Sequence, residues 1–234
     1  MSSELSFEGG GNQAVLTVRM SGRARAMRLR VDPRTCAVVL TVPSRFSRRK
    51  ALAWAADKRA WIEAALAQVP PRSTIGPGSI VPLFGVDHRV DWSPERSRLV
   101  RLERGRMVTG GPEAGLEMRL HRWVRRHAAE LLTRETHEFA AKAGVGVTKV
   151  AVGDPVSRWG SCSASGAIRY SWRLVLAPDW VRRATVAHEV AHRVHMNHSR
   201  AFHVLVAELL ETDPAPAGLW LRRNGAGLHQ VFRS

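Results

Sequence analysis

Four histidines and one glutamate lie close together in the run VAHEVAHRVHMNHSRAF, residues 186–202. His188, Glu189 and His192 form the pattern H-E-V-A-H within this run. Residues four apart face the same side of an α-helix, about 6 Å apart along its axis, so two imidazoles can converge on one metal ion. Glu189 points about 100° away from His188 and can reach an activated water without binding the metal. This spacing is typical of zinc hydrolases.

A catalytic zinc ion needs a third protein ligand and one open position for water. His195 and His198 compete for this place. On an unbroken helix His195 lies about 10 Å from His188 along the axis, too far to share an ion through zinc–nitrogen bonds of about 2.0–2.1 Å. Asn197 tolerates the left-handed conformation that ends helices. A chain reversal there favours His198, on the returning segment, as the third ligand.

Several other side chains stay open as alternatives. Glu208 is a minor candidate for the third ligand after these two histidines, and His203 either supports a ligand or is exposed. Cys162 could bind the metal as a thiolate, although a free cysteine is more often a buried structural residue. Arg158 and Tyr170 are both candidates to stabilise an oxyanion, and the sequence does not choose between them.

The motif needs a helix, and the sequence predicts one that opens at Pro178 and Asp179, with Asp179 as its N-cap. Upstream, residues 113–142 are predicted to form one long helix that ends at Gly144. A last helix is expected from about Ser199 to Thr212. Three short strands are predicted between the long helix and the motif, in VTKVAV, RWGSC and AIRYSWRLVLA.

The N-terminal third has the pattern of a small β-rich module. MRLRV and AVVLTV are predicted strands joined by the turn DPRT, and residues 47–69 are predicted to form one helix capped by Ser47. PPRSTIGPGS then marks a linker. No internal repeat is visible. We therefore expect an α+β protein with three parts: a β-hairpin and helix module (1–75), short strands and a linker (76–112), and a catalytic domain (113–234).

The composition limits the class of protein. The 234 residues carry a formal net charge of +16, nearly all from arginine, which favours an anionic partner such as nucleic acid but also fits a solvated basic surface. No stretch approaches the roughly 18 apolar residues of a membrane helix, and the N-terminus lacks a secretory pattern. Two cysteines exclude a disulfide framework. We expect a cytoplasmic protein without membrane contact.

Two blocks of the sequence resemble a known family. HEVAHRVHMNHSRAF resembles the HELAHxxxxNHSxxF pattern of the YgjP-like (WLM-type) metallopeptidases, which are related to SprT-type proteases. RWGSCSASGAIRYSWRLVLAP, residues 158–178, is similar to the block RWGSCSxxGxIxLNWRLxxAP of that family. Looser similarity covers RLRVDPRTCAVVLTVPSRF and KRAWI, so the resemblance extends from about Val18 to Phe202. Tyr170 and Ser171 replace Leu-Asn, and His203 stands where tryptophan is common.

The resemblance implies a zincin-like catalytic fold, in which the HExxH helix packs against a small antiparallel sheet. It implies a Zn²⁺ ion bound by His188, His192 and His198, with Glu189 as the general base. The strands between Trp159 and Arg173 are expected to border the substrate cleft. The residues expected to contact a peptide substrate are Trp159, Gly160, Ser161 and Tyr170. Gly160 lets another backbone approach closely, which suits a strand edge that accepts an extended peptide.

These observations favour a zinc metallopeptidase that hydrolyses peptide or protein substrates through a metal-activated water. A second hypothesis is a basic, nucleic-acid-associated protein with a structural zinc ion. SprT-type relatives act on proteins bound to DNA, so a protease that cleaves DNA-bound proteins would combine the first and second hypotheses. A third hypothesis is an inactive relative whose helix packs without metal.

Overall fold

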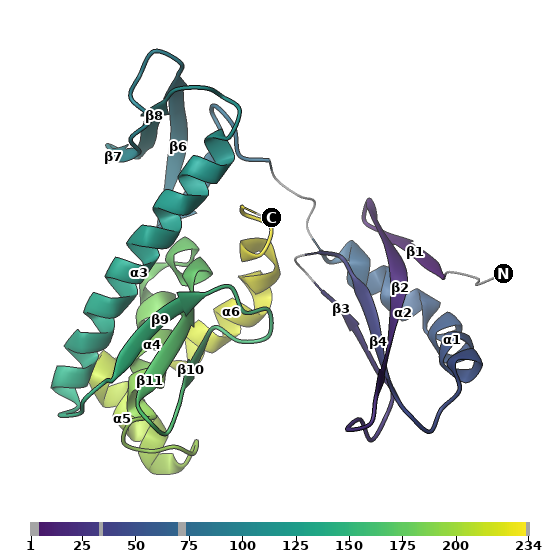
Figure 1. Ribbon diagram of the computed structural model, residues 1–234. Helices are drawn as coiled ribbons and strands as arrows, with labels where there is room; N and C mark the ends of the chain where they lie inside the picture. Colours follow the sequence, from purple (N-terminus) through teal and green to yellow (C-terminus); the bar gives the residue numbers. More distant parts are fainter. Residues whose placement is uncertain (1–4, 33–34, 70–73, 233–234) are drawn as a thin grey trace. The chain divides into compact units, whose positions relative to one another are not determined.

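The computed structural model describes residues 5–32, 35–69 and 74–232 (Figure 1). The chain divides into two compact units, one of which holds the residues before Thr74 together with those after Leu228. The second unit is Thr74–Leu228. The first unit has one small sheet with helices and the second has two, so the predicted α+β class is confirmed. None of the described helices is long and apolar enough to cross a membrane.

The first unit is built on a sheet with the strand order β1-β2-β4-β3. β1 and β2 form an antiparallel hairpin, β2 runs parallel to β4, and β3 runs antiparallel to β4. The two strands predicted from MRLRV and AVVLTV are therefore confirmed as neighbours, while the middle of the DPRT turn lies outside the described residues. The strands are β1 (Ser6–Gly9), β2 (Asn12–Ser21), β3 (Arg28–Val31) and β4 (Val38–Pro43).

Two helices, α1 (Arg48–Asp57) and α2 (Arg59–Ala67), pack on one face of this sheet through apolar side chains of strands and helices. Ser47 caps α1, as predicted, because its hydroxyl accepts a hydrogen bond from the Lys50 backbone N–H at 3.3 Å. The prediction of one continuous helix was wrong, since the helix breaks at Lys58. The apolar stripe continues across the break, so periodicity alone could not show it. The first part of the predicted linker, residues 70–73, lies outside the described residues.

The second unit begins with a sheet of the order β5-β6-β8-β7. Its pairings repeat those of the first sheet: an antiparallel hairpin, a central parallel pair and an antiparallel edge strand. The chain therefore contains a structural repeat that the sequence does not reveal. The strands are β5 (Ile80–Leu83), β6 (Val86–Ser93), β7 (Arg101–Glu103) and β8 (Arg106–Gly110).

The rest of the second unit combines a long helix, a small sheet and a buried 3₁₀ turn. α3 (Leu116–Lys142) is close to its predicted range, and Gly144 follows it with φ +65° as expected. The sheet has the order β10-β11-β9, with β9 (Lys149–Gly153), β10 (Gly160–Cys162) and β11 (Ala167–Ser171).

Two predictions for this region were wrong. The sheet is only partly antiparallel, because β11 runs parallel to β9. WRLVL forms a buried 3₁₀ helix, Trp172–Leu176, rather than the end of a strand. The hydroxyl of Ser171 accepts a hydrogen bond from the Arg173 N–H and starts this turn. A short apolar run carries no periodic signal that separates a buried strand from such a turn.

Three helices complete the unit: α4 (Asp179–Ala191), α5 (Arg200–Leu210) and α6 (Ala215–Leu228). The N-cap of α4 is Pro178, so the prediction of Asp179 was wrong by one residue. Ser199 caps α5 through a hydrogen bond from the Phe202 N–H, in agreement with its predicted start. α6 was not predicted, because its glycines and Pro216 lower its helix propensity.

Candidate active site

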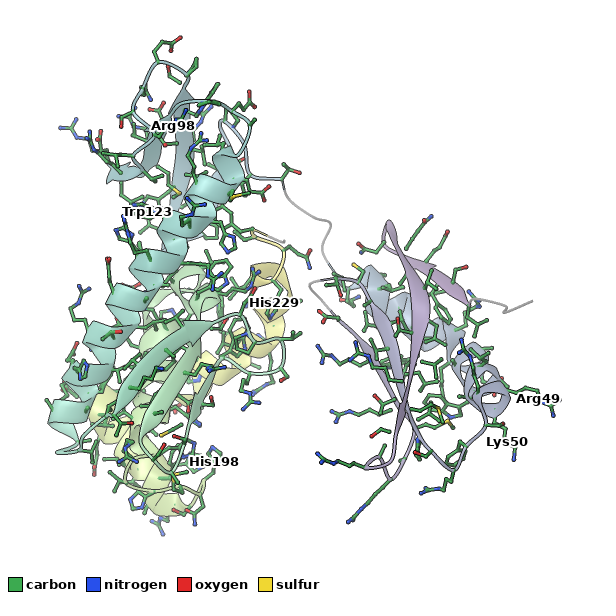
Figure 2. The ribbon with its side chains drawn as sticks, in the orientation of Figure 1. Arg49, Lys50, Arg98, Trp123, His198 and His229 are labelled. Carbon is green, nitrogen blue, oxygen red and sulfur yellow. The ribbon has the colours of Figure 1, made fainter. Side chains whose placement is uncertain are left out.

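Three imidazoles come together where α4 ends and the chain turns back toward α5. His188 lies on α4, and His192 is the C-cap of that helix. His198, labelled in Figure 2, precedes α5. Each offers one ring nitrogen, and these nitrogens all lie within 4.8 Å of one another. The Nε2 atoms of His188 and His198 are 3.2 Å apart. Of the two histidines that compete for the third place, the structure brings His198 into the group.

The chain reversal occurs earlier than the sequence suggested. α4 ends at Ala191, and hydrogen bonds from the N–H groups of Arg193 and His195 to carbonyls of the last turn close it. Asn197 does not have the expected left-handed conformation, so the prediction that it ends the helix was wrong. A run of tight turns reverses the chain without any left-handed residue, and such a run has no distinctive sequence pattern.

His195 contributes to the site through its backbone, a role that the sequence does not predict. Its carbonyl oxygen lies 3.0 Å from Nδ1 of His192. With Nδ1 as the donor, His192 keeps Nε2 free as an acceptor, which is how a metal-binding histidine is usually oriented. The imidazole of His195 is not a member of the three-histidine group.

Phe202 forms the floor beneath the three imidazoles. Its fully buried ring lies 4.9, 4.5 and 4.9 Å from the ring centroids of His188, His192 and His198. The ring of His203 is farther out, 6.3 Å from that of His198. Among the described residues, the potential metal-binding group includes neither His203 nor the other two alternatives, Glu208 and Cys162.

The surroundings favour neutral imidazoles. Burial, together with the neighbouring histidines, lowers the pKa of His188 to about 4. Burial also lowers the pKa of His192, against the effect of its hydrogen bond to the His195 carbonyl. Both rings are therefore unprotonated near pH 7, which is the form that binds a metal ion.

Glu189 lies beside the imidazoles in a buried position, with 5% of its surface exposed. Burial raises the pKa of its carboxyl group to about 7, although Arg158 acts in the opposite direction. Gly160 makes this position available: a Cβ atom added to it would lie 2.4 Å from Oε1 of Glu189. Gly160 therefore permits a close approach, as the sequence suggested, but the approaching group is the Glu189 carboxylate.

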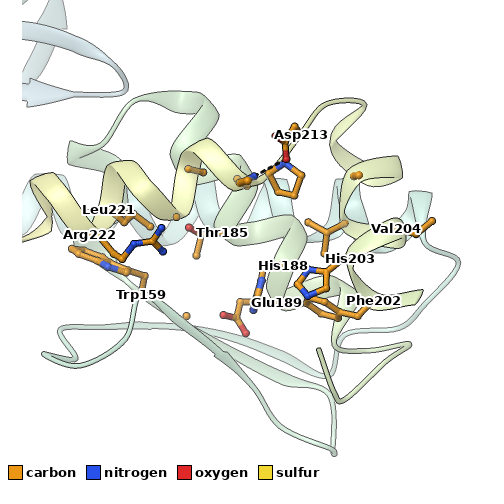
Figure 3. Close-up of a pocket in the computed structure, with 18 of the residues that line it drawn as sticks. Trp159, Thr185, His188, Glu189, Phe202, His203, Val204, Asp213, Leu221 and Arg222 are labelled. Atoms are coloured by element: carbon orange, nitrogen blue, oxygen red, sulfur yellow. Dashed lines mark hydrogen bonds between the residues drawn. The ribbon is translucent and has the colours of Figure 1, made fainter. Parts of the chain in front are cut away.

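A pocket of about 840 Å³ opens next to His188 and Glu189 (Figure 3). Its size is within the range of ligand sites, roughly 300–1,000 Å³. Trp159 and Gly160 line it, as expected for residues that contact substrate. The opposite walls come from α5 and α6. Of these two helices, only α6 was not predicted from the sequence. The lining residues of α6 are Ala215, Ala217, Gly218, Leu221 and Arg222.

The other two residues expected to contact substrate do not line this pocket. Ser161 is the middle residue of β10 and is half-buried. Tyr170 is completely buried, and its hydroxyl lies 3.1 Å from the hydroxyl of Thr136 on α3. Burial also raises the pKa of the Tyr170 phenol. This placement gives Tyr170 a role in packing β11 against α3 and offers no support for an oxyanion contact.

Three imidazoles beside a buried carboxylate, with a pocket next to His188 and Glu189, are a group of side chains that a metal-dependent hydrolase needs. The family model described as "YgjP-like, metallopeptidase domain" matches residues 25–224. The chain therefore belongs to the YgjP-like metallopeptidase family, and the resemblance seen in its sequence is confirmed. Comparisons with curated proteins and with solved structures gave no match.

Proposed function

We propose that the protein is a zinc-dependent peptidase in which His188, His192 and His198 bind the metal and Glu189 is the general base. The observation that carries this proposal is the convergence of three imidazole nitrogens beside a buried carboxylate. The donors fit zinc: in a tetrahedral site with bonds of about 2.0–2.1 Å, ligand nitrogens are roughly 3.3 Å apart. The Nε2 atoms of His188 and His198 are 3.2 Å apart, close to this value.

The chemistry divides between the metal and the chain. A zinc ion held by these imidazoles would supply Lewis acidity, which activates water and polarises a carbonyl group. Glu189 takes a proton from the attacking water and delivers it to the nitrogen of the leaving amine as the C–N bond breaks. A raised pKa suits the first step, because it makes the Glu189 carboxylate a stronger base toward water, and the acid that results keeps its proton until the amine accepts it.

The strand beside Glu189 is suited to hold the substrate. β10 is an edge strand of its sheet, and α4 packs against it. Among the described strands only β11 pairs with β10. An extended peptide that adds to this edge would pass Gly160 and reach the metal-binding group.

Hydrolysis of a peptide substrate by wild type and Glu189→Gln tests the proposal. We expect the variant to bind as much zinc as wild type but to cleave at least about 100-fold more slowly, because only the proton acceptor is lost. Equal rates for the two proteins would remove Glu189 from the mechanism.

We also propose, as a second candidate function, contact with a nucleic acid backbone through the first unit. Arg19, Thr41 and Arg28 are aligned across β2, β4 and β3, and both arginines are exposed. Arg30, two residues along β3, points to the same side because side chains alternate along a strand. The buried residues of these strands alternate with these positions and pack on α1 and α2.

Salt-dependent binding of duplex DNA tests this second candidate. The change Arg19→Glu with Arg28→Glu should weaken binding and reduce its salt dependence. A matched double change in the second unit, Arg101→Glu with Arg104→Glu, controls for net charge. Equal losses in the two variants would show that binding follows total charge rather than this face.

A further inference from the structure

The wall of the active-site pocket that α6 provides is held in place by a tight contact. A Cβ atom added to Gly225 would lie 2.7 Å from Cζ2 of Trp159, so only glycine lets the indole lie this close to the helix. Leu221 and Arg222 lie four and three residues before Gly225, which puts them on the same side of α6. Trp159, Leu221 and Arg222 all line the pocket.

Arg222 brings a positive charge to this mostly apolar wall. Figure 3 shows the side chain extending from α6 into the pocket, on the side where Trp159 lies. Among the residues that the structure describes, no carboxylate forms an ion pair with Arg222. Asp213 also lines the pocket, but its carboxylate accepts a hydrogen bond at 2.9 Å from the N–H of Ala215, the first residue of α6.

The geometry of the pocket points to a carboxylate ligand for Arg222. A guanidinium group offers paired N–H donors that match the two oxygens of a carboxylate. The carbon surfaces of Trp159 and Leu221 beside it leave room for the stem of a side chain. Trp159 directly precedes β10, so a peptide paired with that strand passes Arg222 in mid-chain. This placement favours an acidic side chain over a chain terminus.

We propose that the pocket formed by Trp159, Leu221 and Arg222 makes the protein selective for peptides with a glutamate or aspartate side chain near the bond to be cleaved. This inference rests on the proposed peptidase function and names its substrate class. A hydrogen bond between two charged groups typically changes affinity by about 10- to 100-fold.

Binding and cleavage of a matched pair of peptides test the proposal. Both peptides are acetylated and amidated, and they differ only in glutamate or glutamine at one position. Binding is measured by fluorescence anisotropy with the zinc-loaded Glu189→Gln protein, and cleavage with the wild-type protein. Each measurement is repeated with Arg222→Glu and with Arg223→Glu. The second is the matched control, since Arg223 is exposed, adjacent and outside the pocket lining.

The proposal expects the glutamate peptide to bind about 10- to 100-fold more tightly than the glutamine peptide. Arg222→Glu should abolish this preference, whereas Arg223→Glu should keep it. Equal binding of the two peptides, or a preference that survives Arg222→Glu, would overturn the proposal. The same measurement on a peptide with a free C-terminal carboxylate gives one more outcome. If tight binding appears only with this peptide, the proposal is overturned, because Arg222 would then bind a chain terminus rather than a side chain. Selective binding without any cleavage would instead refute the peptidase function and leave the pocket's selectivity established.

Discussion

At the scale of single residues, the geometry of the site depends on Gly160, a residue without a side chain. Gly160 has no Cβ, and the space that a Cβ would occupy holds the carboxylate of Glu189. The two residues come from different elements, β10 and α4, so the glycine determines how close the proposed base lies to the edge strand. In a reaction that needs near-contact geometry, a displacement of about 1 Å can cost roughly 100-fold in rate.

Replacing this glycine tests the geometry directly. We expect Gly160→Ala to lower kcat by about 10- to 100-fold, because the added methyl group displaces the Glu189 carboxylate. Zinc content should stay unchanged, since the imidazoles are untouched. Gly146→Ala is the control, because a Cβ there has no atom within 4 Å. Unchanged kcat in Gly160→Ala would mean that the carboxylate position is not critical.

The buried carboxylate also predicts how stability depends on pH. The Glu189 carboxyl group has a pKa of about 7 in the folded protein and near 4.5 when unfolded. Between these values the folded state holds a proton that the unfolded state has released, so stability is lost as pH rises through 7. Glutamine does not ionise. At pH 8 the free energy of unfolding of zinc-free Glu189→Gln should therefore exceed that of zinc-free wild type by about 2 to 3 kcal/mol. At pH 4.5 the two free energies should be nearly equal.

Urea unfolding of both zinc-free proteins at the two pH values provides the measurement. His188, whose lowered pKa adds its own pH dependence below pH 6.5, is common to both proteins and cancels in the difference. A wild type as stable as the variant at pH 8 would contradict the burial of an ionised carboxylate.

Residue spacing predicted part of this site. The four-residue period of His188 and His192 gives a shared helix face, which is a local property. Bond lengths argue against His195, and a chain reversal favours His198, although the turn that produces this reversal does not use Asn197. The burial of Tyr170 and the contact of Glu189 with Gly160 could not be predicted, because both depend on how distant elements pack.

At the scale of elements, a buried ion pair fixes the helix that carries the motif. Arg182 of α4 donates to both carboxylate oxygens of Glu135 on α3, and the side chains are 3% and 5% exposed. Burial makes the interaction sensitive to the loss of either partner, because a lone buried charge is costly. A neighbouring pair between the same helices, Arg183 with Glu138, is more exposed at 34% and 42%.

These two pairs provide a matched comparison. Glu135→Gln should destabilise the protein by about 3 kcal/mol, because it leaves the Arg182 charge buried with only Asp179 beside it. Glu138→Gln should cost less than about 1 kcal/mol, since solvent screens the outer pair. Thermal or urea unfolding measures both effects. Similar losses for the two variants would argue against a special role for the buried pair.

The elements were predictable where periodicity and caps agree. α3 has a long apolar stripe and a terminal glycine, and Ser47 and Ser199 occupy their predicted cap positions. α6 was missed because it contains residues that weaken helices, yet its Gly225 is needed for the contact with Trp159. Here tertiary packing outweighs local propensity, and single-sequence patterns record only the latter.

At the scale of the whole molecule, the chain uses one strand arrangement twice. Both four-stranded sheets have an antiparallel hairpin, a central parallel pair and an antiparallel edge strand. The sequences of the two sheets share no visible repeat, because pairing order depends on backbone hydrogen bonds rather than on particular side chains. The family match at residues 25–224 extends over parts of both units.

The zinc content of untagged protein tests the central claim most directly. Wild type should contain about one zinc ion per chain, and His198→Ala should contain far less, because it removes one of three ligands. His195→Ala is the matched control: it removes a nearby imidazole but keeps the backbone carbonyl that faces His192, so it should retain zinc. A wild type without zinc, or a His198→Ala protein with as much zinc as His195→Ala, would contradict the three-histidine site.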